Sequence, residues 1–340
     1  MNTRTHLLTS LLLFISVTGF TQTNTTGSFV YNGILRDYVI HLPPAYTPGV
    51  DFPLVFNLHG LGSNAVQQRF YTQFDAVADT ADFIVVYPNA VGGVWDTVFP
   101  NSPIDDVGFI SALIDTLVDN YGIDLTRVYS TGMSMGSYMS YRLACELNDR
   151  IAAIGSVAGL MTEDFFFYCD PVPAMPVLHI HGTADSTILY QGDIQFNAPV
   201  DSLIQYWVQK NNCPLSPVVT QLPDIDSTDS CTVTKSYYGP CQDSTEVVLY
   251  TINNGGHTWP GTFPWPSFGH TNQDINASVE IWNFFKRHRL NRSTSTRIKN
   301  ELNLDQINLT IFPNPFSDNI NVEINTLREC NIVLYNLLGE

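Results

Sequence analysis

Basic residues are scarce in this chain. Lysine and arginine together number 15 among 340 residues, against 32 aspartates and glutamates, so the formal net charge is −17. Proteins bind nucleic acids and anionic membrane surfaces through clustered lysine and arginine. We therefore expect no nucleic-acid partner and no anionic membrane surface as partner. We interpret the acidity itself mainly as an aid to solubility.

Cysteines are few, and their spacing excludes the common metal motifs. The six cysteines contain no Cys-x-x-Cys pair, and no histidine stands near a cysteine pair. We therefore expect no zinc site, no other metal and no cofactor. Six cysteines allow many disulfide pairings, between which a sequence does not decide. Our preferences are Cys213 with Cys241 and Cys145 with Cys169, and the other pairings stay open.

After the first 20 residues, no apolar run is long enough to span a bilayer. Arg4 is followed by the apolar run Leu7 to Phe20, which is too short and too early for a membrane span. This arrangement is typical of a secretory signal peptide. We expect a signal peptide over residues 1–22 and a secreted, extracellular protein, an environment in which disulfides form.

Continuous apolar runs alternate with stretches of helical apolar spacing in the middle of the chain. Such runs are typical of strands buried on both faces, as in a parallel sheet covered by helices. The alternation predicts an α/β domain with a mainly parallel sheet over residues 27–290. The expected buried strands are 52–58, 82–88, 128–130, 151–157, 177–181 and 247–252, and the expected helices are 107–121, 137–145, 200–210 and 276–288. Residues 28–42 predict an antiparallel hairpin or meander ahead of them.

The composition changes after residue 290. Residues 291–305 are polar and are interpreted as a linker. Residues 306–340 alternate apolar and polar positions in the manner of exposed-face β-strands. A segment of about 35 residues cannot bury a stable core alone. We therefore expect it to be an appendage of the α/β domain.

The segment Gly132 to Gly136 spells Gly-x-Ser-x-Gly. It follows a short β-branched and aromatic stretch and precedes a stretch with helical character. A serine on a sharp turn between strand and helix has an exposed Oγ, and the flanking glycines avoid crowding there. The motif alone arises by chance in roughly one such chain in ten. Ser134 is thus a candidate nucleophile that needs partners elsewhere.

Those partners follow the ends of other strands, where ligands bind in sheets of this type. The N–H groups of Leu61, in a His-Gly-Leu-Gly turn, and of Met135 are placed to form an oxyanion hole. Asp185, after the strand ending at residue 181, can orient a histidine. His257, in a glycine-rich loop after the last strand, is the candidate general base. The order Ser134, Asp185, His257 is that of α/β-hydrolases.

Other polar residues are assigned structural roles. We interpret His59, His179 and His181 as packed or backbone-linked histidines rather than bases. Asp105 and Asp106 precede a helical stretch. We interpret them as carboxylates at a helix N-terminus, where they cap free backbone N–H groups, and not as a metal site or an acid/base pair.

Taken together, these motifs resemble the secreted esterases of the polyhydroxybutyrate depolymerase and feruloyl esterase group. The matching stretches are 36–44, 58–60, 87–89, 95–96, 105–110, 132–136, 141–145, 181–185 and 255–261. The resemblance implies an α/β-hydrolase fold and a triad of Ser134, Asp185 and His257. Two positions depart from the group: Leu61 stands where a cysteine is often found, and Ser137 where a glycine is common.

The C-terminal stretches Ile311 to Phe316 and Leu334 to Glu340 resemble a second family. They are similar to the type IX sorting domain that Bacteroidetes-type bacteria use for outer-membrane secretion. Such domains normally continue further, so we expect residues 306–340 to be a truncated sorting domain. A complete domain would have the outer-membrane secretion machinery as its partner.

The first resemblance implies an acyl-enzyme mechanism but leaves the ester open. Feruloyl or acetyl esters of plant polysaccharide and polyhydroxyalkanoate-type polyesters are the candidates. Trp95, Tyr190 and Trp259 are our candidates for substrate binding, and Phe263 and Trp265 could complete an aromatic cleft with them. For each ring singly, loop packing is the alternative.

Two other classes of function stay open. A serine peptidase of the same fold should contain a propeller or lid domain, for which the chain leaves no room. A non-catalytic binding module on a hydrolase scaffold would not need the triad and oxyanion signals, which are all present. We expect a monomer with an ester substrate.

Overall fold

The structure is a computed structural model that describes the central part of the chain and two later strands. The described residues are 23–97, 104–193, 197–290, 308–312 and 321–325. The chain divides into two compact units, Met1–Asn291 and Arg292–Glu340. The expected signal peptide, the expected linker and most of the expected sorting domain lie outside the described residues. In the second unit, β11 (Asn308–Phe312) and β12 (Asn321–Asn325) form an antiparallel pair.

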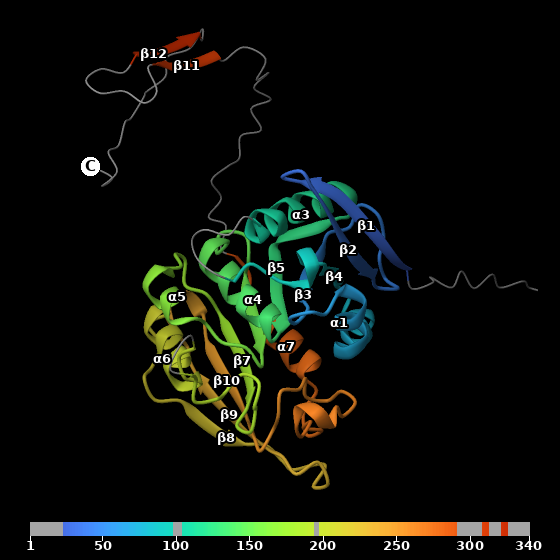
Figure 1. Cartoon of the computed structure of the whole chain (residues 1–340), viewed down its shortest axis with the longest axis vertical. Coiled ribbons are helices and arrows are strands. Elements are labelled where there is room, and N and C mark those ends of the chain that lie inside the picture. Colours follow the sequence, from blue (N-terminus) through green and yellow to red (C-terminus); the bar gives the residue numbers. More distant parts are fainter. Residues whose placement is uncertain (1–22, 98–103, 194–196, 291–307, 313–320, 326–340) are drawn as a thin grey trace, which may run out of the picture. The chain divides into compact units, whose positions relative to one another are not determined.

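Ten strands of the first unit form one sheet (Figure 1). Its order is β1-β2-β4-β3-β5-β6-β7-β10-β9-β8, and the strands from β4 to β10 in this order run parallel. Both edges are antiparallel. The strands are β1 (Thr23–Tyr31), β2 (Ile34–Leu42), β3 (Phe52–Leu58), β4 (Ile84–Pro88), β5 (Ile123–Met133), β6 (Ala153–Val157), β7 (Val177–Gly182), β8 (Val218–Gln221), β9 (Thr232–Tyr238) and β10 (Val247–Asn253).

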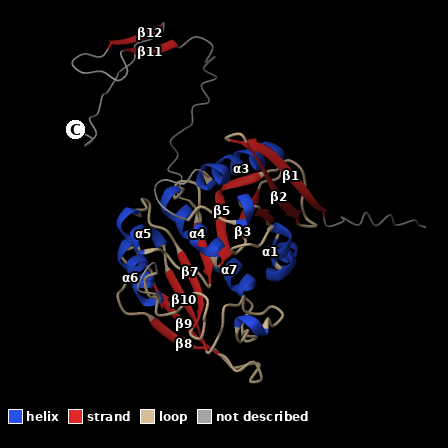
Figure 2. Ribbon diagram, viewed as in Figure 1, coloured by secondary structure: helices blue, strands red, loops and turns tan. Residues whose placement is uncertain are grey.

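Helices cover both faces of this sheet (Figure 2). Apolar side chains of α3, α4 and α6 pack on one face, and those of α1, α2 and α7 pack on the other. The predicted α/β-hydrolase fold, a mainly parallel sheet flanked by helices, is therefore confirmed. The α-helices are α1 (Ala65–Thr72), α2 (Phe74–Ala81), α3 (Asp106–Asn120), α4 (Met135–Glu146), α5 (Glu163–Tyr168), α6 (Val200–Lys210) and α7 (Ala277–Phe285).

The central strands follow from their composition. Every residue of β3, β4, β6 and β7 is buried, as expected for continuous apolar runs between two helical layers. The predicted hairpin is β1 paired with β2, and its turn is Asn32-Gly33, with both residues at positive φ. Asn-Gly favours that two-residue turn because both residues tolerate the left-handed region.

Three short helices and two strands had no counterpart in the predicted pattern. These are α1, α2, α5, β8 and β9. The strand β8 is fully exposed and β9 is only partly buried, so neither carries a long apolar run. The helix α1 has eight residues and begins at an Asn64 side chain that accepts the N–H of Gln67.

Both preferred disulfides are present, Cys145–Cys169 and Cys213–Cys241. Cys231 is buried and unpaired, and Cys330 lies outside the described residues. Across the described part of the chain, no helix is both long and apolar enough to cross a membrane.

Candidate active site

Ser134 lies on a sharp turn between the end of β5 and the start of α4. Its φ is 54° and its ψ is −122°, a conformation that a residue with a side chain rarely adopts. Its backbone N–H donates to the carbonyl of Val157 in β6 at 2.9 Å, which fixes the turn to the sheet. Such strain is stored where surrounding structure enforces it and is common at functional sites.

The two glycines of the motif permit this turn to sit close to β3. A Cβ on Gly136 would lie 2.1 Å from the carbonyl oxygen of Leu58, and a Cβ on Gly132 would lie 2.6 Å from the backbone of Gly136. Gly60, in the turn after β3, faces Ser134 directly: its Cβ would lie 3.4 Å from that of the serine. The absence of these side chains brings the turn after β3 beside the Ser134 hydroxyl.

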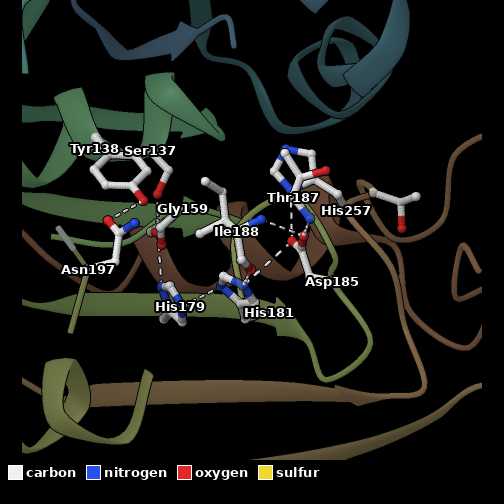
Figure 3. Close-up of polar contacts among 12 residues, drawn as sticks. Ser137, Tyr138, Gly159, His179, His181, Asp185, Thr187, Ile188, Asn197 and His257 are labelled. Carbon is white, nitrogen blue, oxygen red and sulfur yellow. Dashed lines mark hydrogen bonds and ion pairs between the residues drawn. The ribbon is translucent and has the colours of Figure 1, made fainter. Parts of the chain in front are cut away.

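His257 and Asp185 are hydrogen-bonded to each other, as the sequence predicts for a triad. The Nδ1 of His257 lies 2.7 Å from Oδ2 of Asp185 (Figure 3). The other carboxylate oxygen, Oδ1, accepts the N–H groups of Thr187 and Ile188, each at 2.8 Å. Both side chains are buried, that of Asp185 completely. The carboxylate accepts a hydrogen bond from the Nδ1–H group, so Nε2 of the neutral imidazole is free to accept a proton.

Ser134 and His257 open onto the same cavity, of about 830 Å³. They come from loops after β5 and β10, and Asp185 comes from the loop after β7, all at the carboxyl end of the parallel strands. The structure therefore gathers the three predicted residues at one edge of the sheet. Their catalytic roles stay a prediction at this point.

Leu61 and Met135 also line this cavity. Among the described residues, the N–H of neither donates to a backbone oxygen, so both remain available to a ligand. Met135 is the first residue of α4, where helix N–H groups have no intrahelical partner and favour negative charge. The turn carrying Leu61 is held by a 2.9 Å bond from the N–H of Gly62 to the carbonyl of Gly93.

A chain of buried histidines lies behind Asp185. Nε2 of His181 is 2.8 Å from the carbonyl oxygen of Ile188, and its Nδ1 is 3.2 Å from Nε2 of His179 (Figure 3). Nδ1 of His179 is 2.9 Å from the hydroxyls of both Ser156 and Tyr141. Burial lowers the pKa of both imidazoles, of His179 well below its ordinary value. These histidines are packed and structural, as the sequence suggested.

His59 has a similar structural role. Its Nε2 accepts the N–H of Ala90 at 3.1 Å, and its Nδ1 is 2.8 Å from the carbonyl oxygen of Gly60. Burial lowers the pKa of this imidazole too. Asp105 is the N-cap of α3 and accepts the N–H of Gly108 at 2.7 Å, which agrees with the capping interpretation. Asp106 is buried, and its Oδ1 accepts a hydrogen bond from the Arg36 guanidinium at 2.6 Å.

The structure corrects the prediction that Trp95, Trp259 and Tyr190 bind substrate. The rings of both tryptophans are fully buried, and none of the three residues lines the cavity. The indole of Trp95 donates to the carbonyl of His59 at 2.9 Å, and that of Trp259 donates to Ser278 at 3.1 Å. The tyrosine is partly buried, with its hydroxyl 3.2 Å from that of Thr251. These rings pack loops, which was the alternative.

Other aromatic residues form the side of the cavity instead. We call Phe70, Tyr71, Phe263, Trp265 and Phe268 the aromatic wall, and all five line the cavity. Phe263 and Trp265 were candidates from the sequence. The other three were missed, because α1 has no strong helical pattern and a phenylalanine in a loop carries no signal of its own.

A polar pair also lines the cavity and was missed. The hydroxyl of Tyr138, one turn after Ser134 on α4, donates to Oδ1 of Asn197 at 2.7 Å. Figure 3 shows this pair to the left of Asp185 and His257. Among the described residues, no lysine, arginine, aspartate or glutamate lines the cavity, and no group of three or more candidate ligands is placed to hold a metal ion.

Comparison with known proteins supports an esterase. The family described as "Esterase PHB depolymerase" matches residues 36–195. A bifunctional acetylxylan esterase/xylanase of Neocallimastix patriciarum is 26% identical over 66% of this chain and 31% of its own length. Feruloyl esterase D of Neurospora crassa is 27% identical over 78% of this chain and 86% of its own. This chain therefore spans about a third of the length of the Neocallimastix patriciarum enzyme.

Solved structures share the fold. An acetyl xylan esterase from Aspergillus awamori matches with a TM-score of 0.53 at 16% identity, over 69% of this chain and 94% of that one. A thermostable esterase matches with a TM-score of 0.52 at 16% identity, over 78% and 63% of the two chains. The comparisons support the prediction of a carboxylic ester hydrolase, in a group that resembles the feruloyl esterases and polyhydroxybutyrate depolymerases.

Proposed function

We propose that this chain is an exported serine esterase that acts through Ser134, His257 and Asp185. One observation carries the proposal: His257, hydrogen-bonded to Asp185, lines the same cavity as Ser134, which is held in a strained strand-to-helix turn. Each feature alone has structural explanations. A buried acid–histidine pair that shares a cavity with such a serine supplies the base that activation of a hydroxyl nucleophile requires.

The first half of the reaction forms an acyl-enzyme. Nε2 of His257 removes the proton of Ser134 as Oγ attacks the ester carbonyl. The N–H groups of Leu61 and Met135 donate to the oxyanion that develops. The carbon–oxygen bond to the alcohol then breaks, and His257 gives its proton to the departing alcohol oxygen. Asp185 stabilises the imidazolium that exists between these two proton transfers.

The second half releases the acid. Water enters the place of the alcohol and loses a proton to Nε2 of His257 while its oxygen attacks the acyl carbon. The same two N–H groups stabilise the second oxyanion. Its collapse breaks the bond to Oγ, and His257 returns the proton to Ser134. The net reaction consumes one water and yields one acid and one alcohol.

For the substrate, we propose feruloyl or acetyl esters of plant polysaccharide. Relatives with these activities in their names and the uncharged cavity support this choice. A polyhydroxyalkanoate-type polyester is the second candidate, supported by the description of the matching family. Turnover of methyl ferulate, acetyl-xylan and short-chain polyhydroxybutyrate by the same preparation distinguishes them.

Replacement of Ser134 tests the mechanism. We expect Ser134→Ala to reduce kcat for a p-nitrophenyl ester by roughly a thousandfold or more, with folding unchanged. The matched control is Ser202→Ala, which removes an exposed hydroxyl from α6. Near-normal turnover by Ser134→Ala would refute the assignment.

The same proteins test the two other classes of function. A fluorophosphonate probe should label the wild-type chain and not Ser134→Ala. Failure of the wild type to label would favour a non-catalytic binding module. Faster release of product from an aminoacyl amide than from an ester would favour a peptidase.

Export and a monomeric state complete the proposal. The two disulfides fit an oxidising environment outside the cell. N-terminal sequencing of the mature protein tests removal of residues 1–22, and deletion of residues 306–340 in the native host tests a role in outer-membrane secretion. Elution as a monomer in size-exclusion chromatography is expected, and a stable dimer would contradict it.

A further inference from the structure

The aromatic wall begins at the proposed base and continues outward. The ring of Phe268 lies 6.1 Å from that of His257, and the ring of Trp265 lies 5.7 Å from Phe268. The backbone N–H of His257 also donates to the carbonyl of Phe268 at 2.7 Å. The wall and the base are therefore parts of one loop structure after β10.

The outer half of the wall joins this loop to α1. The ring of Tyr71 lies 6.1 Å from Trp265 and 5.3 Å from Phe263, and that of Phe70 lies 5.6 Å from Phe263. Nearly 190 residues separate the two segments in the chain, and Trp259 N–H, which donates to the hydroxyl of Tyr71 at 3.1 Å, ties them together. The wall is thus held by tertiary contacts.

Four rings of the wall are exposed to an extent that packing does not explain. Phe70 is 65% exposed, Trp265 49%, Phe263 41% and Phe268 38%. Adjacent exposed aromatic rings that border a cavity are typical of a binding surface, whereas single exposed apolar residues are ordinary. A ligand that covers these rings would remove their surface from water.

The chemistry of the proposed reaction decides which part of the ester reaches the wall. His257 must give its proton to the departing alcohol oxygen, so this oxygen lies beside Nε2. The group attached to it therefore continues toward Phe268 and Trp265. The acyl group then extends from the other side of the reacting carbon into the same cavity, which Tyr138 and Asn197 also line.

We propose that the aromatic wall binds the alcohol part of the ester, and that this alcohol is a neutral saccharide stacked on the rings. This inference rests on the proposed function. The wall is uncharged, and neutral hydrogen-bonding groups border it: Gln67 lies on α1 one turn before Phe70 and accepts the Ser63 hydroxyl at 2.9 Å. A pyranose offers apolar C–H faces to rings and hydroxyls to such groups. The net charge of −17 disfavours an acidic polysaccharide.

Two substrates with the same acyl group provide the test. Methyl ferulate has no alcohol group large enough to reach the wall, whereas a feruloyl ester of a neutral oligosaccharide does. We expect Phe263→Ala/Trp265→Ala to lower the ratio of kcat/KM for the saccharide ester to that for methyl ferulate at least tenfold. As single variants, Trp265→Phe should keep most of the wild-type ratio and Trp265→Leu should lower it, because only phenylalanine keeps a flat ring at this position.

An equal loss on both substrates would overturn the proposal, since it would place the acyl group on the wall. Faster cleavage of polyhydroxybutyrate than of any saccharide ester would overturn it as well. Leu215→Ala is the matched control, because this exposed apolar side chain is remote in sequence from the wall and does not line the cavity. It should leave the ratio unchanged.

A binding measurement separates this proposal from the proposed function. Ser134→Ala, titrated with an unesterified xylo-oligosaccharide by calorimetry, should bind it, and the added Phe263→Ala/Trp265→Ala pair should weaken binding at least tenfold. If Ser134→Ala binds the oligosaccharide but the wild-type chain has no esterase activity, the catalytic assignment alone is refuted. If the wild-type chain is an active esterase but Ser134→Ala does not bind the oligosaccharide, the role of the wall alone is refuted.

Discussion

We expect the buried histidine chain behind Asp185 to make the folded protein sensitive to acid. His181 donates its Nε2 proton to the carbonyl oxygen of Ile188, so its Nδ1 is an acceptor. His179 must then donate from Nε2 to that nitrogen, and its Nδ1 accepts a hydroxyl proton from Ser156 or Tyr141. In this arrangement both imidazoles are neutral. A second proton on His181 would face the donating N–H of its neighbour.

The direction of the pH dependence follows from these lowered pKa values. Below pH 6.5 or so the unfolded chain binds a proton at His179 that the folded chain excludes, so the free energy of unfolding decreases as pH falls. The slope is about 1.4 kcal/mol per pH unit for one histidine. At pH 5.0 His179 alone would cost about 2 kcal/mol, and His181 acts in the same direction. Above pH 7 this contribution is constant.

Urea denaturation at a series of pH values measures this effect. We expect the free energy of unfolding of the wild type to decrease between pH 6.5 and pH 5.0, and the decrease to be smaller by about 2 kcal/mol in His179→Gln. Glutamine retains a donor and an acceptor but does not titrate. The matched control, His270→Gln, removes an exposed imidazole and should keep the wild-type slope. If His179→Gln does not fold, His181→Gln provides the same comparison.

Two results would refute this reasoning. One is a free energy of unfolding that is constant from pH 7 to pH 5 in the wild type, since a buried neutral pair must lose stability there. The other is an equal slope in wild type and His179→Gln, which would assign the acid sensitivity to other groups. Nuclear magnetic resonance of the two imidazoles at pH 5 would show directly whether they remain neutral.

Three further predictions concern the proposed site and its supports. Trp95→Phe should lower the free energy of unfolding by about 1–3 kcal/mol and reduce kcat, because the buried carbonyl of His59 loses its donor beside the oxyanion turn; urea denaturation and steady-state kinetics measure both. Asp185→Asn should reduce kcat for a methyl ester by roughly 10⁴, because the amide favours the wrong tautomer of the base; a tenfold loss or less would contradict this. Cys145→Ala/Cys169→Ala should lower the free energy of unfolding by about 3.5 kcal/mol, as expected for loss of a cross-link spanning some 25 residues, and an unchanged thermal midpoint would contradict it.

The sequence predicted the scaffold because its signals are local. The apolar runs of β3, β6 and β7 match their strands to within two residues, since strands buried on both faces must be apolar throughout. The Gly-Met-Ser-Met-Gly segment likewise contains its own geometric requirement, because only glycine fits against the backbone of Leu58. Such features need no knowledge of distant parts of the chain.

The aromatic residues show what the sequence could not decide. Trp95 and Trp259 stand in family motifs, and they were reasonable candidates for a cleft, yet each indole donates to a buried acceptor. Phe70 and Phe268 stand outside those motifs and are exposed at the cavity. Whether a ring faces solvent depends on which segment packs against it. That information belongs to the tertiary structure and not to the identity of the residue.

The arrangement of the site suggests a division between chemistry and recognition. Ser134, Asp185 and His257 follow three parallel strands, so the sheet fixes their separation. The aromatic wall comes from α1 and from residues 263–268, outside the parallel sheet, and contacts the proposed triad through the rings of Phe268 and His257. Changes in these two segments can therefore alter which alcohol is bound without moving the strand ends that hold the reacting groups. We therefore expect substitutions in α1 and residues 263–268 to change which substrate is preferred, while the positions of Ser134, His257 and Asp185 stay the same.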